Sequence, residues 1–122
     1  MKWEKSSDTY QEDELLSYAA IAEQKLKHPI AKAIVNKAKA FKLDLPDIED
    51  SKYQIGYGVT VTFEDKMIQV GSQRFMEMEK ITIPDKIENT MRHSHHQGNS
   101  VVLVAINRRL IGAIEIQVVV LK

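Results

Sequence analysis

The chain contains no cysteine, no excess charge of either sign and no long hydrophobic run. Without cysteine it has no disulfide, no thiolate metal ligand and no cysteine nucleophile. Lys plus Arg and Asp plus Glu each number 17, so the basic excess typical of nucleic-acid-binding proteins is missing. The longest apolar runs, Val101–Ile106 and Val118–Leu121, fall far short of the roughly 20 residues of a membrane-spanning helix. The first ten residues are charged and polar, unlike a signal peptide. We therefore expect no nucleic-acid partner, no membrane insertion of this chain and a cytoplasmic location.

What is present suits one folded domain. Of the 122 residues, 43% are hydrophobic and 28% are charged, which is enough apolar material for a core. We expect residues 1–122 to form a single domain without internal repeats. We expect residues 117–122 to be a divergent tail or a non-native end.

Two helices are predicted in the first third of the chain. Thr9-Tyr10-Gln11-Glu12 has the form of a capping box, and apolar residues then recur at helical spacing to about Lys25. Pro29 disfavours helical geometry at His28 and fits the first position of a second helix, whose apolar stripe continues to Phe41. The pattern predicts a helical hairpin with His28 at its elbow.

After the breaker stretch Leu43–Asp47 the pattern changes to strands. Strands are predicted at Tyr53–Ile55, Val59–Phe63, Met67–Val70, Val101–Ile106 and Leu110–Ile116. Between them, helices are predicted at Ser72–Glu79 and Pro84–His96, the second ended by Gly98. This order predicts an α+β fold, with a mainly antiparallel twisted sheet of about five to six strands flanked by two helical hairpins.

Two short glycine-containing segments have residues suited to binding a ligand. Gly56-Tyr57-Gly58 lies between two strands, where glycine admits a close approach to the backbone, although an isolated Gly-x-Gly is more often a bulge or tight turn. Regular alternation begins only after the second glycine, which leaves open whether Gly58 bends the backbone, leaves room for a ligand or does both. Gly71-Ser72 opens a short helix, whose N–H groups attract electron-rich atoms. The alternative for Ser72 is an ordinary helix cap.

Ionisable side chains supply two further candidate sites. A helix break before Pro29 lets His28 and Glu23 face one cleft; the alternatives are a histidine packed in a loop and a solvated carboxylate. The His93–His96 cluster, formed by His93, His95 and His96, lacks the i, i+4 spacing of helical metal ligands and also fits a solvated helix end.

In order along the chain, these elements resemble the nucleotide-binding domain (N-domain) of heavy-metal-transporting P-type ATPases. The resemblance runs from about Glu12 to Ile116 and is carried by Glu23…His28-Pro29, Gly56-Tyr57-Gly58-Val59, Val70-Gly71-Ser72-Gln73-Arg74, Gly98–Ala105 and Leu110–Ile114. A His-Pro element with a Glu five residues before it is specific to the metal-pump branch. Lys27 stands where an acidic residue commonly precedes the His, and Ser72 where Asn is frequent.

The resemblance implies a site for ATP or ADP, with Mg²⁺ accompanying the nucleotide. The implied nucleotide-binding residues are Glu23 and His28 at the adenine, Gly56 and Gly58 along the cleft, and Gly71 and Ser72 at its wall. The resemblance also favours the interpretation that Gly58 leaves room for the ligand. No residue of this chain is implied to be catalytic or to bind a metal. Because no basic phosphate cradle is evident, we expect modest affinity and a triphosphate largely in solvent.

The resemblance also implies that the chain is one cytoplasmic domain of a membrane-embedded pump. The Asp-Lys-Thr-Gly-Thr phosphorylation motif, the hinge Asp motif and a Cys-Pro-Cys motif are missing from the sequence. The domain would therefore present ATP to an aspartate in a separate phosphorylation domain, with that domain and the actuator domain as partners, and would not turn over ATP at a useful rate alone.

Two other classes stay open. One is a metal-binding or protein-interaction module that uses the His93–His96 cluster. The other is a stand-alone hydrolase built around His28 and Glu23, for which no nucleophile or metal set is evident.

Overall fold

The computed structural model describes residues 2–5, 12–27, 29–46, 48, 50–54 and 57–116. Two predicted site residues, His28 and Gly56, lie outside these ranges, as do the predicted cap at Thr9 and residues 117–122. The elements in chain order are β1 (Lys2–Lys5), α1 (Glu12–Glu23), α2 (Pro29–Ala40), β2 (Asp50–Gln54), β3 (Gly58–Phe63), β4 (Lys66–Gly71), α3 (Gln73–Met78), α4 (Asp85–His96), β5 (Ser100–Ile106) and β6 (Arg109–Ile116).

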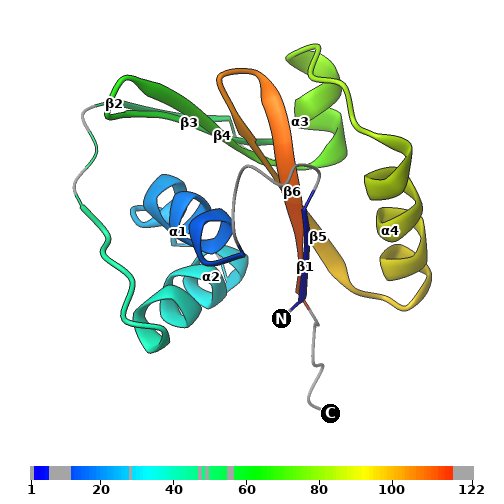
Figure 1. Cartoon of the computed structure of the whole chain (residues 1–122), viewed down its shortest axis with the longest axis horizontal. Coiled ribbons are helices and arrows are strands. Elements are labelled where there is room, and N and C mark those ends of the chain that lie inside the picture. Colours follow the sequence, from blue (N-terminus) through cyan, green and yellow to red (C-terminus); the bar gives the residue numbers. More distant parts are fainter. Residues whose placement is uncertain are drawn as a thin grey trace.

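The strands form one six-stranded sheet in the order β1-β6-β5-β4-β3-β2, and every neighbouring pair is antiparallel. Helices α1 and α2 lie on one side of this sheet, and α3 and α4 lie on the other (Figure 1). The predicted α+β class and antiparallel sheet are confirmed.

Strand β5 shows why its sequence is apolar almost throughout. Val102, Val104 and Ile106 belong to the hydrophobic core beneath α1 and α2, whereas Leu103 and Ala105 belong to the core beneath α3 and α4. Successive side chains of a strand point to opposite faces, so a strand covered on both faces needs apolar residues at every position. The sheet is therefore the middle layer of three.

Helix α1 packs both on α2 and on the sheet. Its residues Ala19, Ala20, Ile21 and Ala22 are all buried. A helical turn that is apolar on every side is typical of such a position, and the small alanines allow close packing. This packing carries the last residue of α1, Glu23, into the interior.

Local backbone signals explain the turns. Glu64 and Asp65 between β3 and β4, and Asn107 and Arg108 between β5 and β6, all have positive φ, as type I′ hairpin turns require. Gly98, at φ +80°, ends α4 as predicted. There the Asn99 N–H donates to Ser94 O at 2.9 Å and the Gly98 N–H to His95 O at 3.0 Å, a Schellman cap.

The structure differs from the prediction mainly at the two sheet edges. Strand β1 was not predicted, because Lys2–Lys5 holds one apolar residue between charged ones. Strand β2 begins at Asp50 rather than Tyr53, since its first residues are polar. Edge strands commonly carry polar and charged residues, which weakens their sequence signal. Within the described ranges, no helix is both long and apolar enough to cross a membrane.

Candidate functional site

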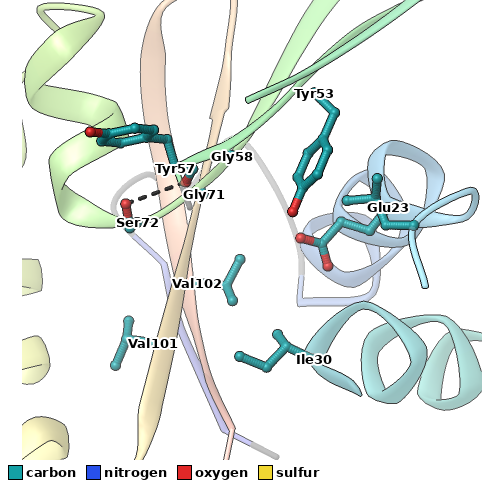
Figure 2. A pocket seen from close by; sticks show the side chains of 10 residues that line it. Glu23, Ile30, Tyr53, Tyr57, Gly58, Gly71, Ser72, Val101 and Val102 are labelled. Atoms are coloured by element: carbon teal, nitrogen blue, oxygen red, sulfur yellow. Dashed lines mark hydrogen bonds between the residues drawn. The ribbon is translucent and has the colours of Figure 1, made fainter. Parts of the chain in front are cut away.

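The antiparallel register places the end of β2, the start of β3 and the end of β4 in one row with the middle of β5. Gln54 of β2 pairs with Gly58 of β3, Gly58 pairs with Gly71 of β4, and Gly71 pairs with Leu103 of β5. The end of α1 and the start of α2 lie beside this row of paired residues (Figure 2). They enclose a cavity of about 270 Å³ lined by Glu23, Leu26, Ile30, Tyr53, Tyr57, Gly58, Gly71, Ser72, Val101 and Val102.

Residues predicted from distant parts of the sequence meet in this cavity. Glu23, Gly58, Gly71 and Ser72 all line it, although they come from α1, β3, β4 and the loop before α3. Their convergence follows from the strand register and the position of α1. His28 and Gly56, outside the described residues, stay predictions.

Glu23 is the principal ionisable group of the cavity. Its side chain is only 4% exposed, and its Oε2 is buried with no hydrogen-bond partner among the described residues. Burial raises the pKa of Glu23 to about 7, because removing a carboxylate from water disfavours its charged form. The alternative of a solvated helix carboxylate is wrong, and a buried acceptor without a partner is suited to a ligand that donates a hydrogen bond.

The other walls combine one aromatic ring with aliphatic groups. In Figure 2 the hydroxyl of Tyr53 points toward the carboxyl group of Glu23, and the side chains of Ile30 and Val102 lie below them. The sequence pattern does not indicate Tyr53, Ile30 or Val102 as site residues. The available signal for Tyr53 was an aromatic residue in the strand that leads into the glycine segment.

The structure corrects the expected role of Gly58. A Cβ built on Gly58 would lie 2.5 Å from Val70 O and 2.6 Å from the Phe75 ring. The side-chain direction of this residue is thus filled by protein rather than open to a ligand. The expectation that Gly58 leaves room for a ligand is wrong for its Cβ direction; the residue is glycine because β4 and Phe75 pack against it.

Ser72 is the cap that its sequence position suggested. Its Oγ accepts a hydrogen bond from the Phe75 N–H at 3.2 Å and donates to Tyr57 O at 3.3 Å (dashed in Figure 2). Its backbone N–H also donates to Tyr57 O, at 3.0 Å. These bonds fix the loop that forms one wall of the cavity.

The His93–His96 cluster lies apart from the cavity. His93, His95 and His96 are exposed in the last turn of α4, on the other side of the sheet from Glu23. In the part of the chain that the structure describes, no group of three or more His, Cys, Asp or Glu residues is arranged to hold a metal ion.

Comparison with known proteins identifies similar chains. No protein-family model matches this chain. A copper-exporting P-type ATPase of Staphylococcus aureus (strain bovine RF122 / ET3-1) is 33% identical over 110 residues, which is 90% of this chain. A copper-exporting P-type ATPase of strain JH9 is 32% identical over the same length. The chain spans only 14% of the length of these relatives.

Solved structures of P-type ATPases share the fold of this chain. The N-domain of HMA8, a copper-transporting P-type ATPase, superposes with a TM-score of 0.76 at 27% identity, covering 96% of this chain and 98% of that one. A zinc-transporting PIB-type ATPase in the E2.Pi state superposes with a TM-score of 0.83 at 26% identity, covering 96% of this chain and 18% of that one.

Proposed function

Because this chain is homologous to the N-domain of heavy-metal-transporting P-type ATPases, we propose that it binds ATP in the cavity beside Glu23. The base enters the cavity and the phosphates remain outside. The chain serves as the cytoplasmic nucleotide-binding domain of a longer membrane-embedded pump, and the transport of copper or another heavy metal belongs to that whole protein.

The observation that carries the proposal is the buried carboxyl oxygen of Glu23, which has no hydrogen-bond partner among the described residues and lies in an otherwise largely apolar cavity. The exocyclic amine of adenine donates the hydrogen bond that this oxygen lacks. The aliphatic walls suit the faces of a purine, because ligand pockets combine apolar surface with a few placed polar groups. The donor–acceptor match therefore favours an amino-bearing base over one with a carbonyl at the same edge.

The size of the cavity suits a base rather than a whole nucleotide. Its volume of about 270 Å³ lies just below the range of about 300–1,000 Å³ typical of pockets for drug-sized ligands. A triphosphate thus extends past the cavity, where Mg²⁺ accompanies it.

The proposed role in phosphoryl transfer is positioning. The described residues hold ATP by its base and leave the γ-phosphate free to meet an aspartate on the phosphorylation domain of the same pump. Phosphoryl transfer depends chiefly on position and on stabilisation of charge, so a domain that only holds the nucleotide still contributes to the reaction. The actuator domain is the other proposed partner.

Neither alternative class is favoured by a specific observation. The exposed His93–His96 cluster belongs to no metal-binding arrangement among the described residues. For a stand-alone hydrolase, the described lining of the cavity offers one carboxyl group and a serine hydroxyl engaged in capping. We therefore propose nucleotide binding without turnover by this chain.

Calorimetric titration of the chain with ATP, ADP and GTP tests the proposal, with phosphate release measured on the same sample. We expect ATP and ADP to bind, GTP to bind more weakly and phosphate release to stay at background. Glu23→Ala should weaken ATP binding, while Glu88→Ala, a carboxylate of α4 on the other side of the sheet, should not. Absence of ATP binding by the folded parent chain, or sustained phosphate release by it, would refute the proposal.

A further inference from the structure

Tyr53 has an unusual position for a large aromatic residue. It lies next to the end of the edge strand β2 and is 43% exposed, yet it lines the cavity that holds Glu23. It pairs with Val59 of β3, and directly paired residues project to the same face of a sheet. Because Val59 belongs to the core beneath α1 and α2, the ring of Tyr53 lies on that same face.

The orientation of Tyr53 completes the cavity. Figure 2 shows its ring on one side of the space, its hydroxyl toward the carboxyl group of Glu23, and the side chains of Ile30 and Val102 farther along the wall. A planar ligand that reaches Glu23 therefore passes between an aromatic ring and an aliphatic surface. A ligand that packs against the ring would also bury apolar surface of Tyr53 that is otherwise exposed.

We infer that Tyr53 is a further nucleotide-binding residue, whose ring packs on the face of the base while Glu23 accepts from the edge of the base. This inference rests on the proposed function and adds a residue that the sequence pattern did not supply. The ring makes the contact, and the hydroxyl is secondary. Aromatic stacking tolerates many bases, so Tyr53 contributes affinity and Glu23 contributes the preference for adenine.

The test compares ATP and adenosine binding by the parent chain, Tyr53→Phe, Tyr53→Ala and Tyr53→Val. We expect Tyr53→Phe to stay within about threefold of the parent, and the other two to weaken binding of both ligands by roughly ten- to a hundredfold, the size of a base–aromatic contact. Valine suits an edge strand, so Tyr53→Val keeps the test valid if the alanine variant unfolds. Phe41→Ala is a matched control, since Phe41 is also 43% exposed but lies outside the cavity.

A spectroscopic readout separates stacking from a structural effect. On addition of ATP, the ring protons of Tyr53 should shift upfield in NMR spectra, whereas those of Phe41 should not move. If the parent chain binds ATP but Tyr53→Ala and Tyr53→Val bind it equally well, the inference fails and the proposed function stands. Equal losses in Tyr53→Phe and Tyr53→Ala would also overturn it, because the ring would then not be the contact. If the folded parent chain does not bind ATP, both the inference and the proposed function fail.

Discussion

Gly58 of β3 and Gly71 of β4 lie directly opposite each other, and neither has space for a Cβ. The Phe75 ring covers both: a Cβ on Gly58 would lie 2.6 Å from it, and a Cβ on Gly71 would lie 2.7 Å from it. A Cβ on Gly71 would also collide with Tyr57 O. The glycine pair thus lets Phe75 pack where the strands meet the start of α3, and so shapes the wall of the cavity indirectly.

This packing predicts that Gly58→Ala and Gly71→Ala each destabilise the fold. Overpacking a filled site typically costs about 1–3 kcal/mol, and urea denaturation measures the change in the free energy of unfolding. Combining Gly58→Ala with Phe75→Leu supplies the control: the double variant should be more stable than the sum of the two single losses predicts. An unchanged midpoint for both single variants would mean that the two positions have room after all.

The raised pKa of Glu23 predicts that the free energy of unfolding depends on pH. Well below pH 4.5 the group is protonated in the folded and the unfolded chain alike, so its burial costs no charge desolvation. As the pH rises toward about 7, the unfolded chain ionises first, and the folded state loses stability. Glu23→Gln removes this loss.

The free energy of unfolding of Glu23→Gln relative to the parent should therefore increase from pH 4 to pH 8. The increase has an upper bound of about 3 kcal/mol. Glu88→Gln, in the first turn of α4, serves as the control that should show no comparable trend. A constant difference between Glu23→Gln and the parent across this pH range would show that Glu23 is not held in a desolvated position.

The cap formed by Ser72 predicts a modest loss of stability on its removal. Ser72→Ala should cost about 1 kcal/mol, because the Phe75 N–H then has no side-chain acceptor. Ser72→Asn should retain most of the stability, since asparagine is an equally good cap. Thermal denaturation of both variants measures this, and equal melting temperatures for Ser72→Ala and the parent would contradict it.

His28 stays a prediction from sequence. If its imidazole contacts adenine, His28→Ala should weaken ATP binding by about 1–2 kcal/mol while the chain still folds. Calorimetry of this variant beside the parent measures the difference. Unchanged affinity in a folded variant would assign His28 to a purely structural position.

Much of this fold can be predicted from residue patterns in the sequence. The bounds of the strands Val59–Phe63 and Val101–Ile106 are predicted within a residue or two. Helices cover these strands, so they are rich in β-branched apolar residues, and this composition is a strong strand signal. The edge strands are harder to predict from the sequence. Lys2–Lys5 becomes a strand by pairing with β6, a tertiary contact that its own residues do not indicate.

The candidate site also combines features that the sequence predicts with features that depend on tertiary packing. Glu23 and Ser72 were predicted because they lie in short motifs, and the register of the strands then brings them together. The burial of Glu23 was not predictable from its helix, since it arises from the packing of α1 between α2 and the sheet. The role of Gly58 was assigned wrongly because Phe75, seventeen residues later, fills the space beside it.

The most direct test of ATP binding beside Glu23 is to map the binding by amide chemical shifts. A second cavity, lined in part by Glu14, Tyr18 and Phe63, lies elsewhere on the fold and serves as an internal control. On titration with ATP, we expect saturable shifts of the Glu23, Tyr53 and Gly71 amides, with those of the second cavity unchanged. Shifts confined to the second cavity or to the His93–His96 cluster, or no shifts at millimolar ATP, would contradict this expectation.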